Sequence, residues 1–119
     1  MKLSNHLEIG RFGEDEAVAY LEKVGYDVLA KNWRFKNLEI DIIAKDNGVL
    51  TFVEVKTRHS FALADVDYFV DTKKQRRLVI AAEAYLHYSG YSGEIRFDIV
   101  AVTIKDGVTI DLIKDAFWT

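Results

Sequence analysis

Two acidic residues and one lysine stand at spacings that could support metal-dependent hydrolysis. Asp41 lies in an apolar, β-branched run, and Glu54 and Lys56 lie in a second such run after a short turn. If the two runs pair with their apolar faces together, all three side chains project from the other face. Neighbouring carboxylates repel unless a cation separates them. The pattern therefore predicts one or two Mg²⁺ or Mn²⁺ ions that activate a water for attack on a phosphoryl group, with Lys56 orienting or deprotonating that water.

The same residues also fit an ordinary solvated sheet surface. Cross-strand Glu–Lys pairs are common, and 29% of the chain is charged, so an Asp followed by Glu-x-Lys also arises by chance. Strict alternation along the first run places Leu38, Ile40 and Ile42 on one face of the strand. It places Glu39 and Asp41 on the other face of the strand. The hypothesis of a metal site requires Asp41 on that face.

The elements that must position these residues follow from hydrophobic periodicity and turn residues. Helical spacing predicts one helix over residues 8–24 and a second, capped by Asp71 or Thr72, that reaches about residue 88. Asn47-Gly48, between two β-branched runs, predicts a hairpin. The predicted strands cover residues 26–35, 38–44, 50–58, 94–104 and 108–113, with a loop over residues 59–71. This order predicts an α/β or α+β sheet with helices packed on it.

Two interpretations of Glu14, in the predicted first helix, are compatible with the sequence. Its helical neighbours Ala17 and Leu21 are apolar, which favours a side chain that faces the sheet. A carboxylate near the start of a helix is also favoured by the helix dipole alone. We expect Gly10 and Gly13 to let this helix pack closely on the sheet.

The second helix opens with four basic residues among residues 72–77. A helix N-terminus attracts anions, and added cations predict a phosphate site there. Lys74 shares a helical stripe with Leu78, so we expect it, together with Gln75, to flank the active site. The other basic residues either contact a nucleic-acid backbone or form a solvated face. They are Lys73, Arg76 and Arg77.

Composition excludes several classes of protein. The chain has 119 residues, which predicts a single domain over residues 1–119. It has no cysteine, and therefore neither disulfides nor a thiolate zinc site, which suits a cytoplasmic protein. No apolar run approaches the ~20 residues of a membrane span, the first residues do not resemble a signal peptide, and no glycine-rich loop predicts a nucleotide cofactor. The net charge of −3 argues against binding nucleic acid through bulk charge.

Asp41 followed by Glu54-Val55-Lys56 resembles the core of the PD-(D/E)XK nuclease superfamily. The chain as a whole is similar to the YraN family of small bacterial endonuclease-like proteins, and its layout is similar to archaeal Holliday junction resolvases. Leu38 departs from the YraN pattern, which usually has glycine there. The most specific matching segments are residues 10–14, 32–34, 39–44, 52–58 and 96–98.

The resemblance implies a restriction-endonuclease-like core, a central mixed five-stranded sheet flanked by helices. It implies that Lys56 is the catalytic lysine, and we expect Glu39 to support the ligands from one strand step away. Arg58, at the end of a matching segment, joins the expected nucleic-acid contacts. The metal ligands implied by the resemblance are Asp41, Glu54, the Val55 carbonyl and Glu14.

The function implied is a Mg²⁺- or Mn²⁺-dependent endonuclease that hydrolyses DNA phosphodiesters, with branched or junction DNA as a candidate substrate. The alternative is a non-catalytic module that keeps the nuclease scaffold to bind nucleic acid or a protein partner. Symmetric cutting of two strands needs two sites, so we expect a homodimer. Its candidate surfaces are a loop with Phe61, Tyr68 and Phe69, and the tail Phe117-Trp118, which could instead pack on the protein's own sheet.

Overall fold

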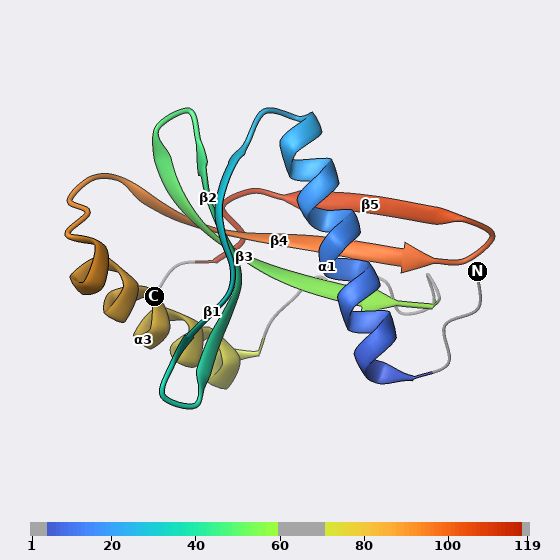
Figure 1. Cartoon of the computed structure of the whole chain (residues 1–119), viewed down its shortest axis with the longest axis horizontal. Helices are drawn as coiled ribbons and strands as arrows, with labels where there is room; N and C mark the ends of the chain where they lie inside the picture. The colour runs from blue at the N-terminus through green and yellow to red at the C-terminus, as the bar shows by residue number, and fades with distance from the viewer. Residues whose placement is uncertain (1–4, 60–70, 118–119) are drawn as a thin grey trace.

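The structure is a computed structural model that describes residues 5–59 and 71–117 (Figure 1). Its order of one helix, three strands, one helix and two strands confirms the predicted order, with element ends within two residues or so of those expected. The predicted loop over residues 59–71 lies almost wholly outside the described residues. The elements are α1 (His6–Lys23), β1 (Asp27–Phe35), β2 (Leu38–Asp46), β3 (Val49–Arg58), α3 (Thr72–Ser89), β4 (Ile95–Ile104) and β5 (Val108–Ile113).

The five strands form one mixed sheet in the order β1-β2-β3-β4-β5. β3 and β4 are parallel because α3 carries the chain back between them, and the other neighbouring strands are antiparallel. Asn47 and Gly48 turn the β2–β3 hairpin with φ angles of +51° and +82°, as a two-residue turn of this type requires. The predicted α/β fold with a central mixed five-stranded sheet is confirmed.

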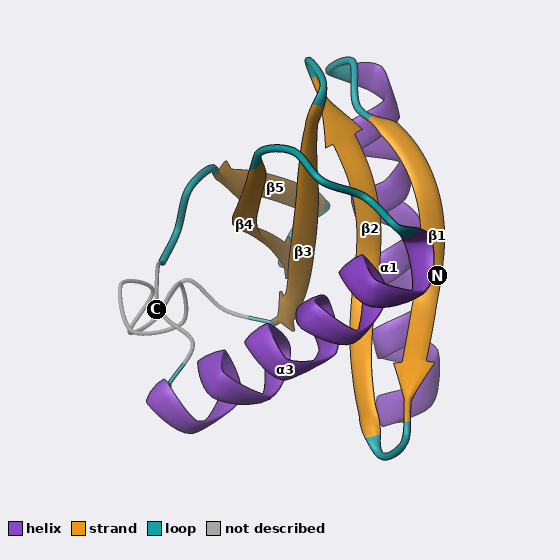
Figure 2. Cartoon of the chain, turned by 90° about the vertical axis from the view of Figure 1, so that its left-hand side faces the viewer, coloured by secondary structure: helices purple, strands orange, loops and turns teal. Residues whose placement is uncertain are grey.

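Each face of the sheet is covered by one helix (Figure 2). On one face, Ala17 and Leu21 of α1 pack with Ile42 of β2 and Val53 of β3. The opposite face has its own buried cluster, which contains Leu78, Ala81 and Ala82 of α3 with Ile43, Leu50 and Phe52. The apolar stripes of both helices are therefore used to bury the sheet.

The strict alternation expected in β2 is interrupted at Asp41, which corrects the sequence prediction. Ile42 packs under α1, whereas Ile40 packs with the α3 cluster. The register between β2 and β3 runs from Asp46↔Val49 to Ile42↔Val53. At the next step the Val55 amide donates to Asp41 Oδ2, at 2.8 Å, so a side chain takes the place of a backbone acceptor.

Gly13 allows α1 to lie against β3. A Cβ atom at this position would stand 1.9 Å from Thr57 Oγ1, closer than atoms can approach, and 3.0 Å from Thr57 Cβ, which is tight. The expectation of close packing is therefore confirmed for Gly13. It is wrong for Gly10, where an added Cβ would meet nothing within 4 Å.

A buried polar network fixes the far end of β2 to β4. Arg96 contacts Asp98 and Asp46, each at 2.8 Å, and Tyr26 Oη donates to Asp98 Oδ2 at 2.7 Å. Burial alone would raise the pKa of Asp46, but hydrogen bonds from Arg96 and Lys114 hold it below its usual value. The network is satisfied within itself, which marks it as structural.

Two expectations concern the surface of the molecule. Phe117 stacks on Phe97 with ring centroids 5.1 Å apart, so this part of the tail packs on the protein's own sheet. Trp118 and the aromatic residues of the loop lie outside the described residues. Neither of the two described helices has the length and apolar character needed to cross a bilayer.

The close approach at Gly13 predicts the effect of Gly13→Ala. We expect this change to lower the free energy of unfolding by about 1–3 kcal/mol, because α1 or Thr57 must move to admit the methyl group. In a Thr57→Ala background the same change should cost at least about 1 kcal/mol less, since the nearest atom is gone. Urea denaturation of the four proteins measures both effects. Equal costs in the two backgrounds would contradict this account of the contact.

Candidate metal-binding site

Asp41 and Glu54 lie side by side on neighbouring strands, as the sequence predicts. Glu54 is only 5% exposed, and Asp41 lines the same cavities. Burial raises the pKa of Asp41 to about 8, and the negative charges of Glu54 and Glu14 act in the same direction. The hydrogen bond from the Val55 amide and the charge of Lys74 oppose the shift. Below about pH 8 Asp41 therefore retains its proton, because ionising it beside Glu54 costs energy.

Two further carboxylates approach Asp41. Glu14 and Glu39 each place one oxygen so that these atoms and one of Asp41 all lie within 4.8 Å of one another. For Glu14, this placement favours the reading of a side chain that faces the site. We expected Glu39 to support the metal ligands from one strand step away. Instead, one of its oxygen atoms lies in the same group as those of Asp41 and Glu14, where it could itself be a ligand.

Polar neighbours orient these two outer carboxylates. Asn32 Nδ2 donates to Glu14 Oε1 at 2.9 Å, from a residue of β1 with a left-handed φ of +51°. Asparagine tolerates this conformation better than most residues. Arg34 pairs with Glu39 at 2.9 Å, but the arginine side chain is largely exposed, so water screens the pair.

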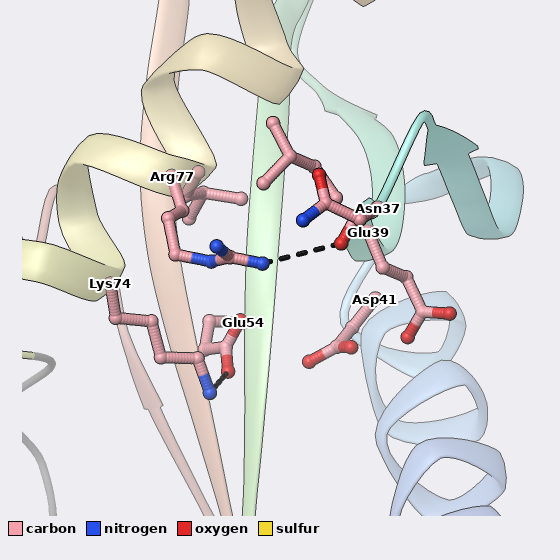
Figure 3. A pocket seen from close by; sticks show the side chains of 8 residues that line it. Asn37, Glu39, Asp41, Glu54, Lys74 and Arg77 are labelled. Atoms are coloured by element: carbon pink, nitrogen blue, oxygen red, sulfur yellow. Dashed lines mark hydrogen bonds and ion pairs between the residues drawn. The ribbon is translucent and has the colours of Figure 1, made fainter.

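Lys74 supplies the cation nearest to the two buried acids (Figure 3). Its Nζ lies 2.5 Å from Glu54 Oε2. Although burial opposes the charged form, this contact and the charge of Glu54 raise the pKa of Lys74 above its usual value. Arg77, one turn further along α3, reaches across the cavity and donates to the Asn37 carbonyl at 3.2 Å.

Two cavities meet at Asp41, Glu54 and Lys74, which line both of them. One of about 220 Å³ lies between β2 and α3, and another of about 300 Å³ lies between α1 and β3. The site therefore has room for an ion and for part of a substrate. The other lining residues are Asn37, Leu38, Glu39, Arg77 and Leu78 in the first cavity, and His6, Ile9, Gly10, Glu14, Val55 and Thr57 in the second.

Lys56 and Arg58 are not brought to these cavities. Lys56 is partly exposed on β3 and lines neither of them, so its catalytic role stays a prediction from the resemblance. Arg58 is 9% exposed, and its Nε donates to Thr103 Oγ1 at 2.7 Å. This burial leaves little of the guanidinium exposed to a phosphate, and the nucleic-acid contact of Arg58 stays a prediction.

The remaining basic residues of α3 fit either of their two readings. Lys73 and Arg76 are exposed, and Gln75 is partly exposed beside them. Only Lys74 and Arg77 of this segment line a cavity with the carboxylates. Sequence reasoning gave no site role to Asn37 and His6, because isolated polar residues in a turn and a helix start carry no signal of their own. It gave none to Asn32 either, although Asn32 lies in a segment that matches the YraN family.

The donor set fits a hard divalent cation. Carboxylate oxygens are the ligands that Mg²⁺ and Mn²⁺ prefer, and here three carboxylates converge, with Glu54 beside one of them, where burial already raises the pKa of Asp41. Asp41 is common to the Glu14–Glu39 group and to Glu54. The residues that could hold an ion are therefore Asp41, Glu54, Glu14 and Glu39, with the Val55 carbonyl as the further ligand implied by the resemblance.

Comparison with known proteins decides the family. A sequence model described as "Uncharacterised protein family UPF0102" matches residues 13–102. The chain belongs to the UPF0102 family. UPF0102 proteins similar to it include one from Parabacteroides distasonis, 49% identical over 93% of each chain. Others are from Chlorobium chlorochromatii, 43% identical over 93% of this chain and 92% of the relative, and from Flavobacterium johnsoniae, 41% identical over 98% of each chain.

The UPF0102 match confirms the resemblance to the YraN family, which is the same family. The matched span begins at Gly13 and includes all four site carboxylates and Lys74. The carboxylates and Lys74 therefore belong to the region that the family model matches, whereas His6, Ile9 and Gly10 of the second cavity precede it.

The raised pKa of Asp41 predicts how stability depends on pH without metal. Between about pH 4 and pH 8 the folded state retains a proton that the unfolded chain loses, so wild-type stability falls as pH rises. Asp41→Asn keeps an acceptor for the Val55 amide and removes the charge. In EDTA at pH 8, we expect it to raise the free energy of unfolding by about 2 kcal/mol, and by much less at pH 5. Thermal melts across pH measure this difference.

A matched control is Asp106→Asn, in the exposed β4–β5 turn. It should leave the pH profile of the wild type unchanged. If Asp41→Asn at pH 8 is no more stable than wild type, the electrostatic account of the site is wrong.

Proposed function

We propose that this UPF0102 protein is a Mg²⁺- or Mn²⁺-dependent endonuclease that hydrolyses DNA phosphodiesters. The observation that carries the proposal is the convergence of Asp41 and Glu54 with Glu14 and Glu39 beside two basic side chains of α3. Stability alone gives no reason to collect three further carboxylates, one of them buried, around Asp41, whose pKa is raised to about 8. Metal-dependent hydrolysis of a phosphodiester would explain why these carboxylates are held together.

Each group of residues has a task in this reaction. Asp41, Glu54, Glu14 and Glu39 would hold one or two ions. When bound, such an ion supplies charge for the phosphoryl oxygens and lowers the pKa of a water. Arg77, which lines the first cavity, and the exposed start of α3 would receive the phosphate backbone, since cations at a helix N-terminus favour phosphate.

DNA as the substrate rests on the resemblance to nucleases and on the basic start of α3. The net charge of −3 is unfavourable for tight binding along a uniform duplex. It is compatible with a substrate held through a few local contacts, which supports branched or junction DNA as the first structure to assay. A cytoplasmic location and a homodimer remain parts of the proposal.

One observation favours a second candidate, a module that binds DNA or a protein without cutting. Lys74 forms an ion pair with Glu54, so one of the two central acids has a cation from the protein itself. In a protein that has lost catalysis, this ion pair would persist when metal is added. The two candidates therefore differ in whether added metal changes DNA cleavage or DNA binding.

Cleavage assays with Mn²⁺ or Mg²⁺ test the proposal on four-way junction, duplex and single-stranded DNA. We expect metal-dependent cleavage of at least one substrate. Asp41→Asn and Glu54→Gln should each lower the rate at least about 100-fold, because each removes a charged ligand. Asp106→Asn is the matched control and should cut like wild type.

The outcomes separate the two candidates. DNA binding that is unaffected by metal, with no cleavage of any substrate, would support the binding module. If millimolar Mn²⁺ neither binds nor promotes cleavage, the nuclease proposal is wrong.

A further inference from the structure

The contact between Lys74 and Glu54 joins a basic residue of a helix to a buried acid of a strand. We propose that the Lys74 ammonium is a stand-in cation, which neutralises Glu54 until a divalent ion binds and then contacts the substrate phosphate. This inference rests on the proposed function and adds an order of events to it. Metal binding comes first, and the phosphate contact of Lys74 follows.

Glu54 needs a cation at all times. Only 5% of its surface is exposed, and it stands beside Asp41, so water alone solvates it poorly. Within residues 5–59 and 71–117, Lys74 is the residue that forms an ion pair with Glu54. Its charge also acts on Asp41, where it lowers a pKa that the other neighbours raise. The ammonium therefore supplies, at Glu54 and near Asp41, positive charge of the kind that a shared metal ion would bring.

Lys74 can leave this position, whereas Glu54 cannot. The lysine side chain is 48% exposed and flexible, while Glu54 is fixed in the middle of β3. The backbone of Lys74 is anchored, because its amide donates to the capping Asp71 Oδ1 at 2.8 Å. Only the side chain has to move.

The place that a released ammonium would reach is suited to a phosphate. Lys74 lines both cavities and lies in the first turn of α3, one turn before Arg77. Repulsion by the bound ion would drive the ammonium away from Glu54. A phosphate at the cavity mouth would then meet Lys74, Arg77 and the helix N-terminus together.

Metal affinity provides the first test, because Lys74 and the ion compete for Glu54. Isothermal titration with Mn²⁺ should give about tenfold tighter binding for Lys74→Met than for wild type, which corresponds to the removal of one competing charge. Lys74→Arg keeps the charge and should bind Mn²⁺ like wild type. Lys105→Met, in the exposed β4–β5 turn, carries the same change in net charge and should also match wild type.

The salt dependence of DNA binding provides the second test. With Ca²⁺ in place of Mn²⁺, the slope of log affinity against log salt concentration should fall by about one in Lys74→Met, since one phosphate contact is lost. In EDTA the two proteins should have equal slopes, because Glu54 holds Lys74. A permanent contact between Lys74 and DNA would change both slopes, and a purely structural lysine would change neither.

The results distinguish this inference from the proposed function. If Mn²⁺ binds wild type and Lys74→Met equally well, Lys74 does not stand in for the ion, whatever the cleavage assays show. If the slopes differ as much in EDTA as in Ca²⁺, the proposed order of events is wrong. If no variant binds Mn²⁺, the metal site itself is contradicted, and this inference falls with it.

Discussion

The account depends on the point where β2 and β3 stop pairing. Beyond the pair Ile42↔Val53, the amide of Val55, two residues further along β3, donates to the Asp41 side chain. This hydrogen bond fixes the Asp41 carboxylate beside Glu54 although the two charges repel. Because an amide donor stabilises a carboxylate, it offsets part of the cost of burying Asp41, and the fold can hold the pair.

The rest of the fold brings other groups to that point. Gly13 lets α1 lie against Thr57 of β3. The next residue of α1, Glu14, is therefore held in the group of carboxylates around Asp41. On the other side, the connection from β3 to β4 starts α3 with its basic first turn over Glu54. Asp41 lines both cavities, so groups from either face of the sheet can reach it. The site is thus assembled from both helices and the β2–β3 hairpin.

Local signals in the sequence predicted the elements and the two central acids. The Asn47-Gly48 turn and the β-branched runs suffice to place Asp41 near Glu54, because hairpin register follows from them. The break in alternation at Asp41 was not predictable, since it arises from a side chain that replaces a backbone acceptor. The contact of Lys74 with Glu54 depends on how α3 crosses the sheet, and the burial of Arg58 depends on its neighbour Thr103, 45 residues further along the chain. Such tertiary effects leave no periodic trace in the sequence.

The most direct measurement is the anomalous scattering of crystals grown or soaked in millimolar Mn²⁺ at neutral pH. The account predicts an anomalous peak coordinated by the Asp41 carboxylate and by at least one of Glu14, Glu39 and Glu54, with the Lys74 ammonium displaced wherever Glu54 is a ligand. The account would be contradicted by crystals with manganese bound elsewhere or not at all, in which Lys74 still contacts Glu54.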